Sequence, residues 1–258
     1  MKRPIKNVLV SIVIVGSMIF TNACTTLSSR ETPIVKVVRE YAPVVVNIRT
    51  EKIFNPKESQ EWGTYSQELD NFSQEYFGES HSEDALIYKS IGSGVILDNN
   101  GLIVTNAHVI QKAEDIYVVL NDGTILKAEV IGMNQIDDLA IIKAEIPYAV
   151  REIKFANIND VMIGETVIAI GNPFGLENSV TVGVLSGKDR AFSSSRCPYV
   201  CSGLLQTDAP INPGNSGGAL LNLDGELIGV NLAVVQSAES IGFAIPVDKI
   251  LSLLKIYK

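Results

Sequence analysis

A serine enclosed by glycines is the feature of this sequence that most directly suggests chemistry. Ser216 lies within the segment 207–220, which reads TDAPINPGNSGGAL, and Gly214 and Gly218 flank the serine at a spacing of two residues. Because glycine has no Cβ, the backbone can turn tightly here and a substrate carbonyl can come close. Such a turn can aim two backbone N–H groups at one point, as a developing oxyanion requires. An ordinary glycine-rich hairpin loop has the same composition. The chain must therefore also supply a base and an acid.

The chain contains two histidines, and only one of them has an apolar frame. His81 lies in a polar, acidic stretch, whereas His108 lies near the end of the apolar, strand-like run 101–110. A general base must be held within hydrogen-bond reach of its nucleophile, and a rigid element does this better than a polar loop. A histidine in an apolar strand is often a core residue, but here the same chain also carries the glycine-rich serine loop, which favours a catalytic role. His108 is therefore the candidate base.

The order of these residues along the chain separates the serine-hydrolase folds. The spacing Gly-x-Ser-x-Gly also fits a nucleophile elbow, but there the histidine comes last and no histidine follows Ser216. The order His, Asp, Ser requires an aspartate between 108 and 216. Asp137 and Asp138 directly precede the apolar stretch 139–143. An aspartate can fix the imidazole tautomer and stabilise the imidazolium. We expect one of the two to do so and the other to be a solvated turn residue.

Six segments carry a resemblance to a known family, and they occur in the family's order along the chain. They are 91–97 (IGSGVIL), 105–110 (TNAHVI), 138–143 (DLAIIK), 171–175 (GNPFG), 206–220 (QTDAPINPGNSGGAL) and 242–246 (GFAIP). By these motifs the sequence resembles the HtrA (Deg) family of trypsin-fold serine proteases, over roughly residues 34 to 255. The resemblance implies a catalytic triad of His108, Asp138 and Ser216. It also implies an oxyanion hole in the loop of Gly214, Asn215 and Ser216, with the N–H groups of Gly214 and Ser216 as donors.

The same resemblance implies peptide hydrolysis through an acyl-enzyme, without a metal or an organic cofactor. The substrate pocket is expected to be lined by Ile211, Asn231, Leu232 and Ala233. Pro210 stands six residues before the serine, where basic-specific trypsins carry an aspartate, so we expect small or medium aliphatic residues at the cleaved bond. Most family members continue into PDZ domains, but we expect none in this sequence. Family members form trimers, so a homotrimer is implied, although the residues themselves do not show it.

The implied function is that of a quality-control protease whose partners are unfolded or exposed polypeptides. Two other functions remain open from the residues alone. One is a non-catalytic chaperone or docking module built on a protease fold, and the other is a processing protease for one dedicated partner.

The composition and turn signals predict an all-β fold. A chain of 258 residues with 46% apolar and 19% charged residues is long enough for a substantial core. Short apolar runs separated by turn signals such as 121–123 (NDG) and 223–225 (LDG) indicate barrels or sandwiches. One strand is expected over 102–110, and short helices over 33–42 and 247–256.

The resemblance refines this all-β fold to a trypsin-like double β-barrel. The protease domain would span 33–258, with the first barrel at about 44–150, the second at about 151–246 and the C-terminal helix at 247–256.

The N-terminus resembles an export signal. A basic start and an apolar run of 13 residues (8–20) predict a secretory signal over 1–23, since the run is short for a bilayer span. A short membrane anchor is the alternative. The following Thr-Asn-Ala-Cys resembles a bacterial lipoprotein cleavage site, with Thr21 where leucine is usual. The resemblance implies lipidation of Cys24, a tether over 24–32, and a membrane-attached protein of the periplasm or cell envelope.

The charge balance and the remaining cysteines narrow the choice of partners. The net charge is −8, and it becomes −11 when residues 1–23 with their three basic side chains are removed. An acidic protein of this kind is a poor partner for nucleic acid or an anionic membrane surface. Cys197 and Cys201 could form a disulfide if a turn brings their Cα atoms within about 4.4–6.8 Å. A metal site would need two more ligands, and none is near them in the sequence.

Overall fold

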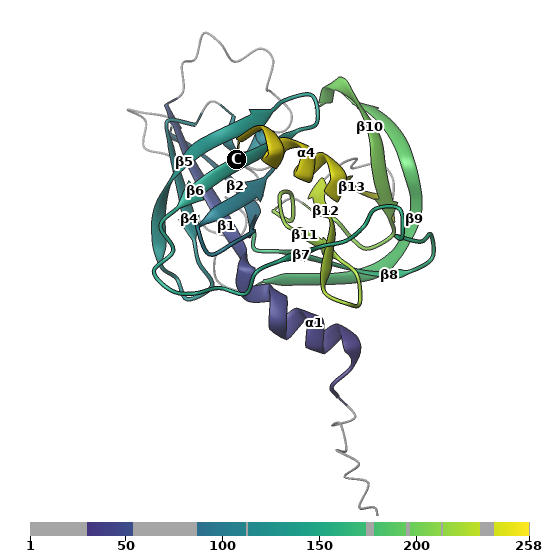
Figure 1. Cartoon of the computed structure of the whole chain (residues 1–258). Helices are drawn as coiled ribbons and strands as arrows, with labels where there is room; N and C mark the ends of the chain where they lie inside the picture. The colour runs from purple at the N-terminus through teal and green to yellow at the C-terminus, as the bar shows by residue number, and fades with distance from the viewer. Residues whose placement is uncertain are drawn as a thin grey trace, which may run out of the picture.

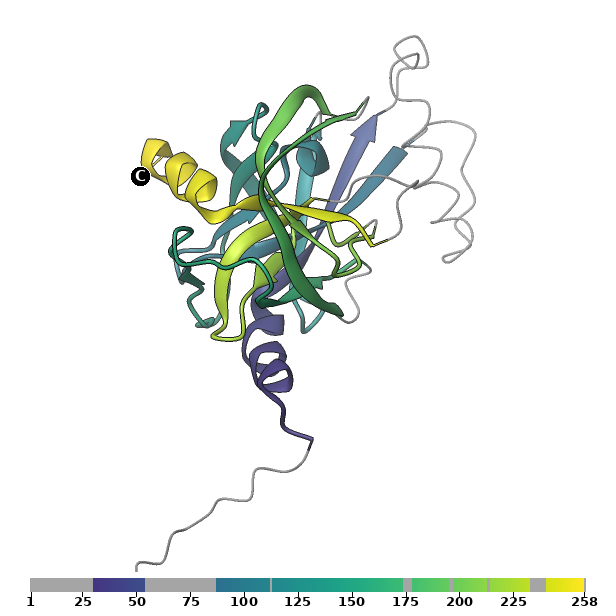
Figure 2. The ribbon, with the colours of Figure 1, turned by 90° about the vertical axis from the view of Figure 1, so that its right-hand side faces the viewer.

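Two β-barrels lie side by side in the computed structural model of this chain, with a helix near each end of the described sequence (Figures 1 and 2). The structure describes residues 30–53, 87–111, 113–173, 178–194, 197–212, 214–232 and 240–257. The expected signal 1–23, the candidate lipid site Cys24, His81 and Ala233 lie outside the described residues. No helix in the described ranges is both long and apolar enough to span a bilayer.

The first barrel is closed and has the strand order β1-β2-β3-β6-β5-β4. All its neighbouring strands are antiparallel, and the pairing of β1 with β4 closes the barrel. Its strands are β1 (Val45–Ile53), β2 (Ile87–Ile96), β3 (Leu102–Thr105), β4 (Asp115–Val119), β5 (Ile125–Asn134) and β6 (Leu139–Ala144).

The second barrel follows the order β11-β8-β9-β10-β13-β12, and the pairing of β11 with β12 closes it. The short strand β7 adds to β12 in parallel. The strands are β7 (Lys154–Phe155), β8 (Thr166–Gly171), β9 (Ser179–Ser194), β10 (Cys197–Thr207), β11 (Ala219–Leu221), β12 (Glu226–Leu232) and β13 (Gly242–Pro246). The all-β, trypsin-like double-barrel prediction is confirmed.

The expected turn signals join neighbouring strands as hairpins. In the turn between β4 and β5, Asp122 Oδ1 accepts a hydrogen bond from the Thr124 N–H at 2.9 Å, and Gly123 has φ +85°. In the turn between β11 and β12, Asn222 Oδ1 accepts from the N–H groups of Asp224 and Glu226. A side-chain acceptor that holds backbone N–H groups two to four residues ahead explains why these short sequences reverse the chain.

Two of the helices lie where the sequence predicts them. Helix α1 (Pro33–Tyr41) begins after Thr32, whose side chain accepts from the Val35 N–H, and it passes into the 3₁₀ turn η1 (Ala42–Val44). Helix α4 (Val247–Tyr257) follows Pro246, in agreement with the pattern of apolar residues. A third helix, α3 (Ala107–Ile110), was not expected. The prediction of a strand over 102–110 is therefore wrong in its second half, because β3 ends at Thr105.

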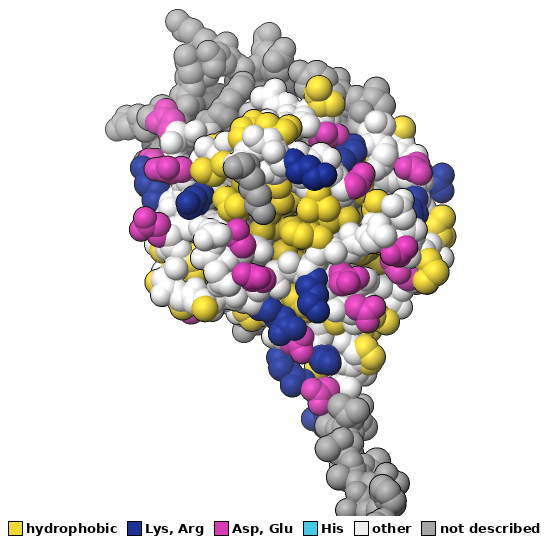
Figure 3. Space-filling view, in the orientation of Figure 1, with side chains coloured by type: hydrophobic (Ala, Val, Ile, Leu, Met, Phe, Trp, Pro, Cys, Tyr) yellow, Lys and Arg dark blue, Asp and Glu magenta, His cyan; other side chains and the backbone are white. Residues whose placement is uncertain are grey.

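One apolar core runs through both barrels and beneath the helices. It joins Ile48 and Ile142 of the first barrel to Leu227 of the second and to Ile250 of α4. A smaller cluster, which includes Leu185, lies within the second barrel. On the surface, acidic and basic side chains are interspersed, and apolar side chains gather near the centre of the face in Figure 3. The continuous core fixes the two barrels relative to each other.

The two cysteines expected to form a disulfide both lie in β10. An extended strand advances about 3.3 Å per residue, so residues four apart are separated by about 13 Å in a regular strand. The pairing of β10 with β9 shifts register between Cys197 and Cys201. A disulfide needs Cα atoms within about 7 Å. It would therefore require a backbone conformation other than the strand at this position.

The Tyr41 ring gives a direct test of the junction between α1 and the barrels. Tyr41 is 2% exposed, the Arg151 guanidinium carbon lies 4.9 Å from its ring centroid, and a Cβ added at Gly225 would collide with the ring. We expect Tyr41→Ala to lower the free energy of unfolding by about 3–5 kcal/mol, because it leaves a cavity. Val35→Ala, an exposed change on the same helix, should stay within about 0.5 kcal/mol of wild type. Urea titrations measure both, and equal midpoints for the two variants would contradict the prediction.

Candidate active site

Asp138 has a backbone conformation that few non-glycine residues adopt. Its φ is +51°, in the left-handed region, which costs an L-residue roughly 1–2 kcal/mol. Several hydrogen bonds hold it there. Its carbonyl accepts from the Ala107 N–H and from Asn106 Nδ2, both at 3.1 Å. Because α3 begins directly at these donors, the same contacts explain why the strand stops at Thr105.

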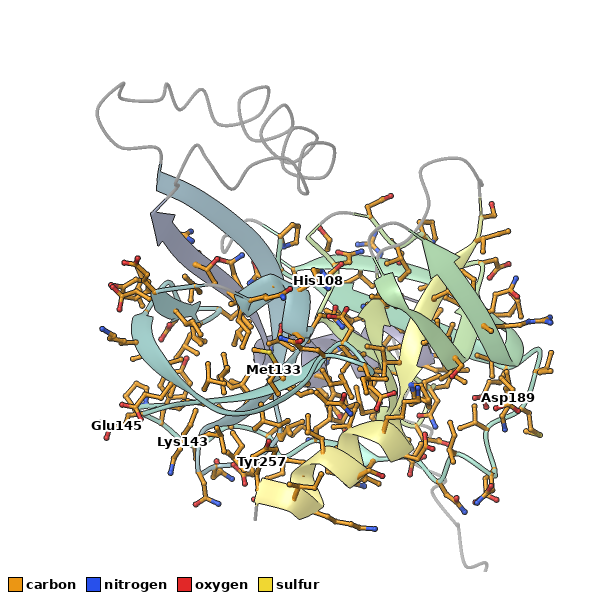
Figure 4. All side chains as sticks on the ribbon, turned by 90° about the horizontal axis from the view of Figure 1, so that it is seen from above. His108, Met133, Lys143, Glu145, Asp189 and Tyr257 are labelled. Atoms are coloured by element: carbon orange, nitrogen blue, oxygen red, sulfur yellow. The ribbon has the colours of Figure 1, made fainter. Side chains whose placement is uncertain are left out.

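Both carboxylate oxygens of Asp138 bind His108. The backbone N–H of His108 donates to Oδ1 at 2.8 Å, and the imidazole Nδ1 lies 2.6 Å from Oδ2. An ionised carboxylate only accepts hydrogen bonds, so Nδ1 is the protonated nitrogen of the neutral ring and Nε2 is the acceptor. Such an imidazole can take up a proton through Nε2. Figure 4 shows His108 near the boundary between the two barrels.

The neighbouring Asp137 has a different partner. Its carboxylate lies 2.7 Å from the ammonium of Lys249 on α4, and it also accepts from Asn134 Nδ2. The expectation that one of the two aspartates is simply solvated is therefore wrong, since the side chain of Asp137 is only 27% exposed.

Ser216 lies in a turn that only glycine-rich sequence can form. The residue is 1% exposed, and its neighbours Gly214 and Gly217 have φ +94° and +84°. A Cβ at Gly214 would collide with Pro173, and one at Gly217 would collide with the carbonyl oxygen of Ser93. The glycines therefore allow the serine turn to pack directly against its surroundings.

Ser93 on β2 connects the serine turn to the histidine segment. Its N–H donates to the Ser216 carbonyl at 2.8 Å, and its hydroxyl donates to the Gly214 carbonyl at 2.6 Å. Its own carbonyl accepts from the Thr105 hydroxyl at 2.7 Å, three residues before His108. Ser93 is fully buried, so these bonds are shielded from water. Ser93 is not among the residues expected from the sequence, although its position between two glycines within a family motif was a signal.

The residues expected to form the oxyanion hole lie in this turn, and the Gly217 N–H donates to the carbonyl of the expected pocket residue Asn231 at 3.0 Å. The N–H of Asn215 donates to the Asn212 carbonyl at 3.0 Å, so it is directed within the loop. Ile211 packs over Gly242 of β13. Asn231 is fully buried and donates to the Ala219 carbonyl at 3.0 Å, and Leu232 is 6% exposed. Within the described ranges, no three His, Cys, Asp or Glu side chains gather where they could hold a metal ion.

The fold is that of a trypsin-like peptidase. A model of the trypsin-like peptidase domain matches residues 92–230, more than half of the chain, and the chain belongs to this family.

The relatives narrow the family further. The chain is 38% identical over 222 residues to a protein of Synechocystis sp. named putative serine protease HhoA, over 85% of this chain and 55% of that protein. It is 39% identical over 229 residues to a Halomonas elongata protein named probable periplasmic serine endoprotease DegP-like, over 82% and 46%. A third relative is Protease Do-like 1, chloroplastic, of Arabidopsis thaliana, with 44% identity over 163 residues, 62% of this chain and 37% of that protein. The resemblance to Deg-type serine proteases is confirmed. The chain spans about half the length of the relatives it matches, or less.

The contacts of Asp138 predict a sharp effect of a single amide substitution. Asp138→Asn keeps the shape but can offer an N–H to the ring, which favours the wrong imidazole tautomer, so peptidase activity should fall by about 10⁴-fold. Asp189→Asn is the matched control, because Asp189 also has a positive φ (+55°) and lies away from His108 (Figure 4). Rates on a peptide substrate and circular dichroism of both variants measure the effect. Equal activity of Asp138→Asn and wild type would contradict a catalytic role for this carboxylate.

Proposed function

We propose that this chain is a serine endopeptidase that cleaves unfolded or exposed polypeptides in the bacterial cell envelope. The observation that carries the proposal is the double contact of the Asp138 carboxylate with the backbone and ring of His108, in a segment that Ser93 links by hydrogen bonds to the turn of Ser216. Relatives named serine protease and periplasmic serine endoprotease support the reaction class and the compartment.

In the proposed reaction, Ser216 Oγ attacks the substrate carbonyl carbon while its proton passes to Nε2 of His108. The C–N bond of the tetrahedral intermediate then breaks, and the imidazolium returns the proton to the leaving amine. Water repeats the two steps on the acyl-enzyme and releases the acid product. Asp138 holds the ring in the required tautomer and stabilises the imidazolium through its 2.6 Å contact.

The oxyanion of the intermediate would be bound by the backbone N–H groups of Gly214 and Ser216. The Asn215 N–H closes a turn onto the Asn212 carbonyl, which supports a loop folded around one point. Two preorganised N–H donors stabilise charge that develops in the transition state. In another serine protease, the loss of one such donor lowers kcat by about 10²–10³-fold.

The pocket for the residue before the cleaved bond would be small and apolar. Pro210 supplies no carboxylate there, and its carbonyl accepts from the Thr181 hydroxyl at 2.8 Å. Ile211 lies over Gly242. With Leu232 as a further wall, these residues support a preference for small or medium aliphatic side chains over Lys or Arg.

The proposed enzyme is attached to a membrane through a lipid on Cys24, which follows the leader 1–23. A tether over 24–32 would then separate the lipid from α1. Two other functions remain as outcomes of the test: a chaperone or docking module that uses this fold without catalysis, and a protease that processes one partner. A homotrimer is proposed on the family resemblance alone.

The first test is cleavage of casein by the chain from residue 25 onward, beside its Ser216→Ala variant. Wild type should degrade casein, and the variant should lose about 10⁴-fold or more in rate because the nucleophile is absent. Gel densitometry over time measures both. If neither protein cleaves casein and neither reacts with a fluorophosphonate label, the non-catalytic alternative replaces this proposal. Cleavage restricted to one native partner would instead indicate the processing protease.

The lipid proposal is tested by growing expressing cells with labelled palmitate. The full-length chain should incorporate the label, whereas Cys24→Ala should not, because the thiol is the proposed attachment point. Cys197→Ala is the matched cysteine control and should retain the label. Incorporation into Cys24→Ala, or none into wild type, would rule out lipidation at this position.

A further inference from the structure

The turn that presents Asp138 is built around the side chain of Asn134. Asn134 Oδ1 accepts from the N–H groups of Ile136 and Asp137, at 3.0 and 3.2 Å. Asn134 Nδ2 donates to Asp137 Oδ2 at 2.7 Å. These bonds hold the residues that directly precede Asp138, whose φ is positive. The conformation of Asp137 therefore influences how Asp138 meets His108.

Lys249 of α4 binds this turn from a distant part of the chain. Its ammonium donates to Asp137 Oδ1 at 2.7 Å and to the Ser202 carbonyl of β10 at 2.6 Å. The side chains of Lys249 and Asp137 are only 21% and 27% exposed, so water and salt screen this ion pair less than a surface pair. One cation thus links the acid-bearing turn of the first barrel to a strand of the second.

The helix that carries Lys249 is fixed at both ends. Val247, Ile250, Leu253 and Leu254 are buried against the barrels. At the C-terminal end of α4, which Figure 4 labels, the Tyr257 ring packs so closely on Gly132 of β5 that an added Cβ would collide with it. Lys249 therefore reaches the turn from a rigid support.

The charges explain what the ammonium does at this turn. Asp137 and Asp138 are adjacent carboxylates, and both are partly buried. Without a cation, their repulsion and the cost of burying Asp137 favour a turn in which Asp137 moves into water. Such a change would rotate the backbone of Asp138 and weaken its contacts with His108.

We propose that Lys249 is a positioning residue that holds Asp137, and through it the strained Asp138, in the geometry that orients His108. The inference rests on the proposed peptidase function. It assigns to the C-terminal helix a part in forming the active site, although no residue of that helix belongs to the triad.

The test compares Lys249→Met and Lys249→Arg with Lys255→Met, a control at an exposed position of the same helix. Three quantities are measured on the chain from residue 25 onward: kcat and KM on a peptide substrate, the melting temperature, and the NMR signal of the His108 Nδ1 proton. A proton in a short N–H···O⁻ bond is strongly deshielded, so this signal reports the Asp138 contact directly. His81→Gln in all variants leaves one histidine and assigns the signal.

We expect Lys249→Met to lower kcat by about 10-fold or more with little change in KM, because the base is displaced rather than the substrate. The Nδ1 proton signal should broaden or move upfield. Lys249→Arg keeps the charge, so its kcat and its Nδ1 proton signal should lie close to those of wild type. Lys255→Met should match wild type in both quantities. If Lys249→Met does not fold, Lys249→Gln, which is neutral but can still donate to Ser202, is measured in its place.

A wild-type Nδ1 signal and kcat in the neutral variant would overturn the inference, even if the melting temperature falls. This outcome is distinct from failure of the proposed function. If the proposed function fails, wild type and Ser216→Ala will be equally inactive. The NMR signal will then still decide whether Lys249 holds the Asp138–His108 contact.

Discussion

The arrangement of the site depends on the two contacts that the Asp138 carboxylate makes with His108. Its two oxygens bind the backbone and the ring of the same histidine, so the position and the tautomer of His108 are set together. The backbone of Asp138 has an unfavourable positive φ, and its carbonyl binds two donors at the start of α3. Strain of this kind persists only where surrounding contacts outweigh it. The hydrogen bonds to Asn106, Ala107 and His108 supply that compensation.

Buried polar groups join the two barrels at the place where the serine turn lies. Ser93 of the first barrel binds Ser216 and Gly214, and Asn47 of β1 donates to the carbonyl of Asn172 at 2.8 Å, just after β8. Both side chains are fully buried, so breaking these bonds would leave unsatisfied groups away from water. An apolar core can tolerate small sliding of its layers, whereas such bonds have a defined geometry. These hydrogen bonds therefore define the relative position of the two barrels at the site more closely than apolar packing alone would.

Local patterns predicted those elements whose cause is local. Helix α1 begins at a side-chain cap and a proline, the hairpins turn at NDG and LDG, and α4 follows a proline with apolar residues at helical spacing. The strand predicted over 102–110 failed at Thr105 because its apolar residues continue into α3. The helix there is caused by hydrogen bonds to Asp138, about thirty residues away, and no local pattern contains that information.

The sequence by itself determined which residues could do chemistry and in what order, because two histidines and the glycine-rich motif around Ser216 leave few combinations. It also narrowed the acid to two adjacent aspartates, and the family motif, though not the residue type, implied Asp138. Only the tertiary structure showed both contacts of Asp138 with His108, the binding of Asp137 to Lys249, and the position of Ser93 against the serine turn. These partners are 30 to more than 100 residues apart along the chain. Their contacts follow from closing two barrels around a shared core, which no short segment of sequence encodes.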